Sequence, residues 1–230
     1  MSEIKANLER VRARIAAACA RIGRSPDEVR LVAVTKTMPV PVIQEAVTAG
    51  VVILGENRVQ DAAAKMKEVS ADVTWHLIGH LQRNKVKKAV TMFDMIQSVD
   101  SSQLAAEIDK RCEQHGRVMG VLVEVNTSGE ATKFGVSPSR ALDLIEEMSH
   151  LRNIVVKGLM TIGAFTDDER AVRDCFVTLR ELGRKADDAG IPSVEMRFLS
   201  MGMTSDFEMA IEEGSNMVRI GTAIFGPRRT

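Results

Sequence analysis

The chain has 230 residues, of which 45% are hydrophobic and 27% charged, a balance that excludes a disordered or fibrous protein. Its 31 basic and 31 acidic residues cancel, so we expect neither a nucleic-acid partner nor an anionic membrane surface. No apolar run reaches the roughly 20 residues of a membrane span, and the start of the chain lacks the apolar stretch of a signal peptide. We therefore expect a cytoplasmic protein.

Apolar residues recur at steps of three and four from Ile4 to Ile22, which predicts an amphipathic N-terminal helix. Strand-like runs and helical stretches then alternate along the chain. The predicted strands are Leu31–Thr35, Val51–Leu54, Trp75–Ile78, Met95–Val99, Met119–Val125, Ile154–Thr161, Glu195–Ser200 and Met217–Ile220. The predicted helices include Val40–Ala49, Glu56–Val69, Gln103–His115, Ser139–Met148, Glu169–Ala189 and Phe207–Glu213.

Eight β/α units in a chain of this length predict an α/β fold, a single (β/α)8 TIM barrel with an extra N-terminal helix on its outside. We expect one domain over residues 1–230. Continuously apolar runs such as Val51–Leu54 suit parallel strands that are covered on both faces. The alternative is an open doubly wound sheet, but the turn at Thr35–Met38 lacks the glycines of a dinucleotide-binding loop.

Lys36 directly follows the first predicted strand, and β/α barrels carry their functional groups at the C-terminal ends of strands. Its stem leaves an apolar wall, and loss of solvation favours the neutral amine. A neutral amine can attack an aldehyde and form a Schiff base. The alternative is a rim lysine whose stem lies along the surface and whose charged end stays in water.

A glycine turn follows the seventh predicted strand at Ser200–Gly202. Ser205 and Glu208 match a capping box, so we expect a helix to begin there. Barrels of this class often hold phosphate at such a helix start, and Gly221-Thr222 after the eighth strand would close the same cup. An ordinary glycine turn followed by a capped helix gives the same pattern.

Arg219 ends the eighth predicted strand and presents fixed, charged donors, unless it forms a salt bridge with a rim carboxylate such as Glu213. His76 and His80 are four residues apart, but no acidic partner completes a metal site. The basic run at residues 83–88 is interpreted as a solvated helix face rather than an RNA site.

Six segments in one order, at residues 31–36, 55–60, 75–85, 158–163, 199–203 and 218–226, resemble the pyridoxal phosphate homeostasis protein family. The resemblance covers nearly the whole chain and implies a barrel similar to the N-terminal domain of bacterial alanine racemases. It also implies pyridoxal 5′-phosphate as the cofactor. The residues that it assigns to the cofactor are Lys36 (Schiff base), Asn57 (beside the ring), Arg219 (facing the pyridine nitrogen), and Ser200, Gly221 and Thr222 (phosphate).

An arginine cannot donate a proton to the pyridine nitrogen as a carboxylic acid can, so the ring would be a poor electron sink. Alanine racemases also use a tyrosine base from a second domain, whereas this sequence has no tyrosine and ends shortly after the last predicted strand. The place of a racemase arginine here reads Lys133-Phe134-Gly135. We therefore expect a monomeric carrier or regulator in vitamin B6 homeostasis, without turnover, whose partners include pyridoxal phosphate-dependent apo-enzymes.

Three other interpretations are open. A weak racemase-like enzyme would pair Lys36 with a partner such as His80 or Lys133. A Schiff-base aldolase would use Lys157, in the sixth strand. A pure scaffold would carry no cofactor and show no yellow colour.

Overall fold

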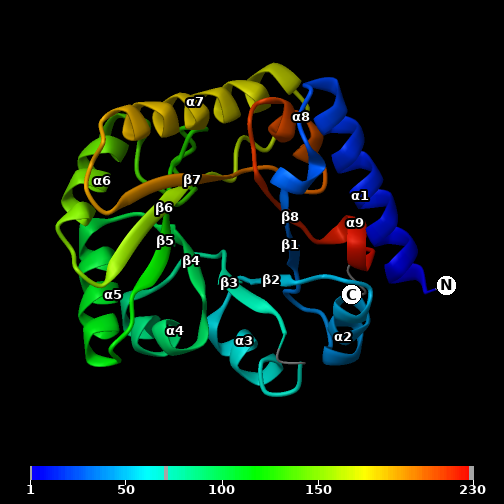
Figure 1. The fold of residues 1–230 in the computed structure, drawn as a ribbon, viewed down its shortest axis with the longest axis horizontal. Helices are drawn as coiled ribbons and strands as arrows, with labels where there is room; N and C mark the ends of the chain where they lie inside the picture. The colour runs from blue at the N-terminus through cyan, green and yellow to red at the C-terminus, as the bar shows by residue number, and fades with distance from the viewer. Residues whose placement is uncertain (1, 70–71, 228–230) are drawn as a thin grey trace.

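The computed structural model describes residues 2–69 and 72–227, and within them eight parallel strands close a barrel in the order β1 to β8 (Figure 1). The predicted α/β barrel is confirmed. Each expected strand lies within two residues of its predicted bounds. The strands are β1 (Arg30–Val34), β2 (Ile53–Glu56), β3 (Thr74–Leu77), β4 (Met95–Val99), β5 (Met119–Glu124), β6 (Ile154–Met160), β7 (Val194–Ser200) and β8 (Met217–Ile220).

Helices cover the outside of the barrel, and among the described residues none is long and apolar enough to cross a membrane. The expected helix over Glu56–Val69 is shorter, because Glu56 ends β2 and Arg58 has extended backbone angles. The helices are α1 (Glu3–Arg21), α2 (Val40–Thr48), α3 (Val59–Lys65), α4 (Val86–Met92), α5 (Ser102–Gln114), α6 (Ala141–Ser149), α7 (Glu169–Asp188), α8 (Phe207–Glu212) and α9 (Thr222–Phe225).

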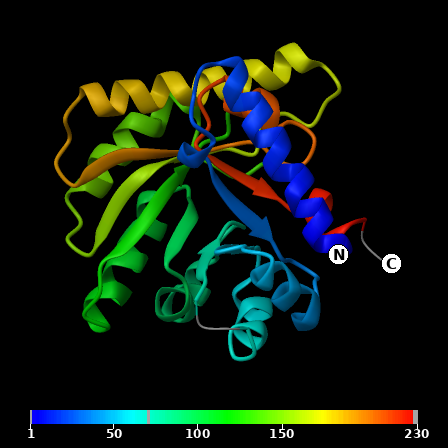
Figure 2. The ribbon, with the colours of Figure 1, turned by 45° about the vertical axis from the view of Figure 1, so that its right-hand side comes forward.

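The N-terminal helix α1 packs on the outside of the barrel, as predicted. It contacts α8, α9 and α2, and Figures 1 and 2 both show it beside α9. Leu8, Val11 and Ile15 form its buried stripe. On its polar side, Arg14 makes two bonds to Glu208, of 2.7 and 2.8 Å. The helix therefore joins the first and last parts of the chain.

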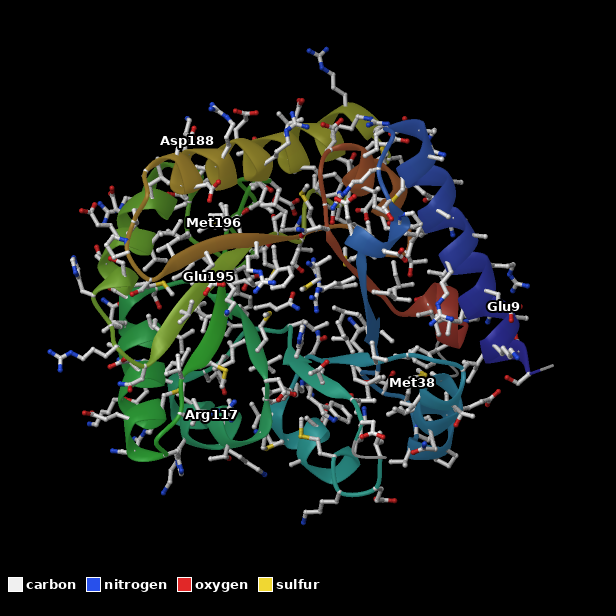
Figure 3. All side chains as sticks on the ribbon, viewed as in Figure 1. Glu9, Met38, Arg117, Asp188, Glu195 and Met196 are labelled. Carbon is white, nitrogen blue, oxygen red and sulfur yellow. The ribbon has the colours of Figure 1, made fainter. Side chains whose placement is uncertain are left out.

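Side chains fill the inside of the barrel (Figure 3). An apolar cluster occupies its interior, formed by Val32, Ile53, Met95, Leu122, Met160, Phe198 and Met217. Side chains two residues apart on a strand share a face, so Glu124, Ser200 and Arg219 also point inward, nearer the C-terminal ends of their strands. All three are buried. The interior is thus apolar in one layer and polar in the next, at the end where barrel sites lie.

Two local features of the strands were not predicted from the sequence. Val52 is 60% exposed and precedes β2, so the apolar run Val51–Leu54 is not covered on both faces along its whole length. Gly158 in β6 has a φ of 145°, and a Cβ there would lie 1.9 Å from the carbonyl oxygen of Phe198 in β7. Only glycine allows this close approach of the two strands.

Candidate functional site

A pocket of about 340 Å³ lies where β1, β7 and β8 end. Four residues that the sequence analysis selected line it together, although they come from opposite ends of the chain. They are Lys36, Arg219, Gly221 and Thr222. Met203 and Thr204, from the loop after β7, also line this pocket, which we call the Lys36 pocket.

An ion pair between Lys65 and Glu56 lies behind the end of β1, next to Thr35, the residue before the half-buried Lys36. Lys65 Nζ donates to Glu56 Oε1 at 2.6 Å and to the carbonyl oxygen of Thr35 at 2.7 Å. Thr35 Oγ1 also donates to Glu56 Oε1, at 2.7 Å. Thr37 then turns with a φ of 66°, which is costly for a β-branched residue. The backbone directly before Lys36 is therefore held by Lys65.

Arg219 is buried in the wall of the Lys36 pocket, with 4% of its surface exposed. Its Nη1 donates to Ser200 O (2.8 Å) and Ser200 Oγ (2.7 Å), and its Nη2 donates to Thr161 O (2.8 Å). Burial lowers the pKa of the guanidinium to about 10, against the opposing charges of Glu124 and Asp206, so it stays charged at pH 7. Within the described residues, these bonds use three of its five N–H groups.

Glu213, the carboxylate considered as a partner of Arg219, does not pair with it. Glu213 instead pairs with Arg173 (3.1 Å) and Arg180 (2.7 Å) on α7. Glu213 therefore does not neutralise the charge of Arg219, which lies between the interior of the barrel and the pocket.

Ser200 is fully buried as the last residue of β7, and it is not among the described residues that line the Lys36 pocket. Its hydroxyl donates to Gln97 Oε1 at 2.7 Å while accepting from Arg219. Thr204, four residues later, does line the pocket, and its Oγ1 accepts a bond of 3.3 Å from the backbone N of Ala223. The Thr204 hydroxyl thus joins the loop after β7 to the start of α9.

The loop after β7 owes its shape to Gly202, whose φ is 95° and whose Cβ would lie 2.6 Å from Ala210 Cβ. The expected capping box of Ser205 and Glu208 is wrong. Asp206 occupies the N-cap position of α8, and its Oδ1 accepts from Met203 N at 2.6 Å. Glu208, in the first turn of α8, pairs with Arg14 on α1.

Asn57 lines a separate pocket of about 490 Å³ at the same end of the barrel, together with His80, Lys85 and Phe134. The rings of His80 and Phe134 stack at 3.8 Å, and His80 Nδ1 lies 3.4 Å from Asp100 Oδ2. The structure therefore brings Asn57 near the mouth of the barrel but not into the group formed by Lys36 and Arg219.

The lysines of the alternative interpretations have other partners. Lys133 Nζ donates to Glu130 Oε1 (2.5 Å) and Gly163 O (2.6 Å). Lys157 pairs with Glu195 at 3.1 Å. Neither belongs to the described lining of the Lys36 pocket. No group of residues suited to a metal ion occurs in the described part of the chain.

Glu124 is a buried carboxyl that the sequence analysis missed. It ends β5 with 3% of its surface exposed, and its Oε2 has no hydrogen-bond partner within the described residues. Burial, with a further contribution from Asp100, raises its pKa to about 7, although Arg219 opposes the shift. The sequence could have indicated it, because Glu124 follows Leu122 by two residues on a strand and that spacing turns both side chains to the same, inward face.

A family model for the N-terminal domain of alanine racemase matches residues 4–229 of the chain. A pyridoxal phosphate homeostasis protein of Aquifex aeolicus is 44% identical over 223 residues, covering 96% of this chain and 97% of the relative. The chain belongs to the pyridoxal phosphate homeostasis protein family. The resemblance found in its sequence segments is thereby confirmed.

Solved structures agree with this assignment. An unknown protein from Bifidobacterium adolescentis is 42% identical with a TM-score of 0.93, over 96% of this chain and 94% of that one. PipY of Synechococcus elongatus, in a structure with PLP bound, is 35% identical with a TM-score of 0.81. That comparison covers 92% of this chain and 100% of PipY.

Proposed function

We propose that the protein binds pyridoxal 5′-phosphate at Lys36 and acts in vitamin B6 homeostasis as a carrier or regulator without turnover. The main observation behind this proposal is that Lys36, Arg219, Gly221 and Thr222 line one pocket at the mouth of the barrel. Pyridoxal phosphate supplies an aldehyde that condenses with a lysine amine and a ring that withdraws electrons from the attached group. The PLP-bound structure of PipY, a relative over nearly the whole chain, supports the choice of ligand.

The residues of the Lys36 pocket fit this cofactor. Its volume of about 340 Å³ is in the range of small-molecule sites. Hydroxyl groups of Thr204 and Thr222, which both line the pocket, suit a phosphate. The two remaining N–H groups of Arg219 suit the ring nitrogen, which is an acceptor when unprotonated.

We therefore assign Lys36 to the aldehyde, Arg219 to the ring nitrogen, and Thr204, Gly221 and Thr222 to the phosphate. Ser200, which the family resemblance assigns to the phosphate, is better placed to hold Arg219, because its hydroxyl is bonded to Arg219 and Gln97. Asn57 would reach the ring only from the neighbouring pocket.

The pocket favours a carrier over a racemase. Arg219 stays charged and offers the ring nitrogen a hydrogen bond rather than a proton, which weakens electron withdrawal. A racemase needs a base on each face of the reacting carbon, and the chain has no tyrosine. His80 stacks on Phe134 and Lys133 is held by Gly163 O, outside the described lining of the Lys36 pocket.

Two measurements test the proposal. Purified protein titrated with pyridoxal phosphate should develop the yellow absorbance of an attached cofactor, Lys36→Ala should abolish it, and the control Lys157→Ala should retain it. Loaded protein incubated with L-alanine in deuterated water should show no α-proton exchange at enzyme-like rates. One general acid/base group is worth about 10²–10⁴-fold in rate, so a second base would be easily detected. Fast exchange that Lys36→Ala abolishes would establish the racemase-like alternative.

The proposal includes a single barrel domain over residues 1–230 that acts as a monomer in the cytoplasm and delivers its cofactor to pyridoxal phosphate-dependent apo-enzymes. Mixing loaded protein with such an apo-enzyme tests delivery. Activation faster than the spontaneous release of cofactor supports direct transfer, and activation at the release rate contradicts it.

A further inference from the structure

A row of buried polar side chains crosses the barrel from β3 to β8 and ends at Arg219. His76 Nδ1 lies 2.8 Å from Gln97 Nε2, and Gln97 Oε1 accepts from Ser200 Oγ at 2.7 Å. Ser200 Oγ in turn accepts from Arg219 Nη1 at 2.7 Å. All four residues are buried, so these bonds form out of contact with water.

The Gln97 amide gives this row its direction, because its Nε2 faces His76 and its Oε1 faces Ser200. Burial lowers the pKa of His76 to about 4, helped by the charge of Arg30, so the ring is neutral and its Nδ1 can accept from Gln97. The oxygen of the Gln97 amide lies toward Ser200, whose hydroxyl donates to it. The Ser200 hydroxyl has one proton, so its lone pairs face Arg219.

Among the described residues, Arg219 donates its hydrogen bonds to neutral oxygen atoms. These are the carbonyl and hydroxyl oxygens of Ser200 and the carbonyl oxygen of Thr161. These three bonds fix the plane of the guanidinium and determine where its two other N–H groups point. Without Gln97, the Ser200 hydroxyl is free to rotate and turn its proton toward Arg219.

We propose that Gln97 is a positioning residue for the cofactor: acting through Ser200, it orients the guanidinium of Arg219 toward the ring nitrogen, while His76 fixes the Gln97 amide. This inference rests on the proposed function, because it requires the ring to lie against Arg219. It also gives Ser200 a role distinct from phosphate binding.

The test compares Gln97→Met, Ser200→Ala and the double variant with wild type. Methionine has the length of glutamine and fills irregular space. Ser98→Ala is the matched control, because Ser98 is equally buried on β4, faces the other way and donates to Gly79 O at 2.7 Å. Affinities for pyridoxal phosphate and for pyridoxal are measured for each variant, together with the pH dependence of the absorbance of attached cofactor.

Gln97→Met and Ser200→Ala should each weaken both ligands by the same factor, about 10-fold, as expected for one bond to a charged group. The double variant should lose no more than about 2-fold beyond either single variant, because both changes break one row. In the single variants the absorbance should gain a pH step that wild type lacks, as the ring nitrogen becomes able to take up a proton. Ser98→Ala should show none of these effects.

The inference is overturned if Gln97→Met folds and behaves like Ser98→Ala, or if the two losses simply multiply in the double variant. It is also overturned if Ser200→Ala weakens pyridoxal phosphate but not pyridoxal, which would place Ser200 at the phosphate. Should Gln97→Met fail to fold, Ser200→Ala alone decides by this last comparison. If wild type attaches no cofactor at Lys36, the proposed function itself has failed, which is a separate result.

Discussion

Replacing Glu124 by glutamine is expected to stabilise the cofactor-free protein at pH 8 and to leave its stability nearly unchanged at pH 4.5. Glu124 is buried at the end of β5, and its pKa rises from 4.5 to about 7, chiefly through burial. At 1.36 kcal/mol per pKa unit, this rise corresponds to about 3 kcal/mol in the free energy of unfolding.

The sign follows from which state holds the proton more tightly. A carboxyl whose pKa is raised in the folded state contributes its full stability below pH 4.5, and this contribution is lost as the pH rises through 7. Wild type therefore carries the whole cost of a buried charge at pH 8, and glutamine carries none of it. The difference in unfolding free energy should grow from near zero to about 3 kcal/mol, or roughly 6–12 °C in melting temperature for a chain of this size.

The assay is urea unfolding of both proteins at pH 5, 6, 7 and 8. Glu9→Gln is the control, because Glu9 lies exposed on α1 (Figure 3) and its replacement removes a carboxyl without changing the interior. A Glu124→Gln difference that is constant from pH 5 to 8 would refute the reasoning. So would destabilisation at pH 8, which would mean that the ionised pair of Glu124 and Arg219 is net stabilising.

Three further changes test other parts of the structure. Gly158→Ala should cost at least about 3 kcal/mol in urea unfolding, because its methyl would overlap the backbone of β7, whereas Gly120→Ala on β5 meets only ordinary contacts and should be tolerated. Lys65→Met should lower the free energy of unfolding by about 3–5 kcal/mol, because the buried carboxylate of Glu56 loses its ion-pair partner. Adding Glu56→Gln should restore most of this stability, and a double variant as unstable as Lys65→Met would contradict the ion-pair argument. Thr204→Ala should weaken pyridoxal phosphate about 10-fold and leave pyridoxal unchanged, and equal losses would remove Thr204 from the phosphate site.

The strand pattern could be predicted because each strand is a short apolar run bounded by polar turns, and a chain of eight such units has few ways to close. Lys36 and Arg219 could be selected for the same reason, since each stands at the end of a recognisable strand. The structure adds that both belong to one pocket.

Bonds between side chains of different strands could not be predicted in this way. Gln97 and Ser200 are 103 positions apart in sequence, and their bond exists only because β4 and β7 face each other across the barrel. The capping box at Ser205 and Glu208 failed because the helix begins one residue later, with Asp206 as its N-cap, and Glu208 instead pairs with Arg14, 194 positions away. Local spacing carries no information about such distant partners.

The most direct test of the central claim is to reduce loaded protein with borohydride and map the modified peptide. The pocket geometry predicts a pyridoxyl group on Lys36, in the peptide that joins β1 to α2, and its loss from that peptide in Lys36→Ala. Modification mainly at Lys133 or Lys157, or no attached cofactor at all, would contradict the account.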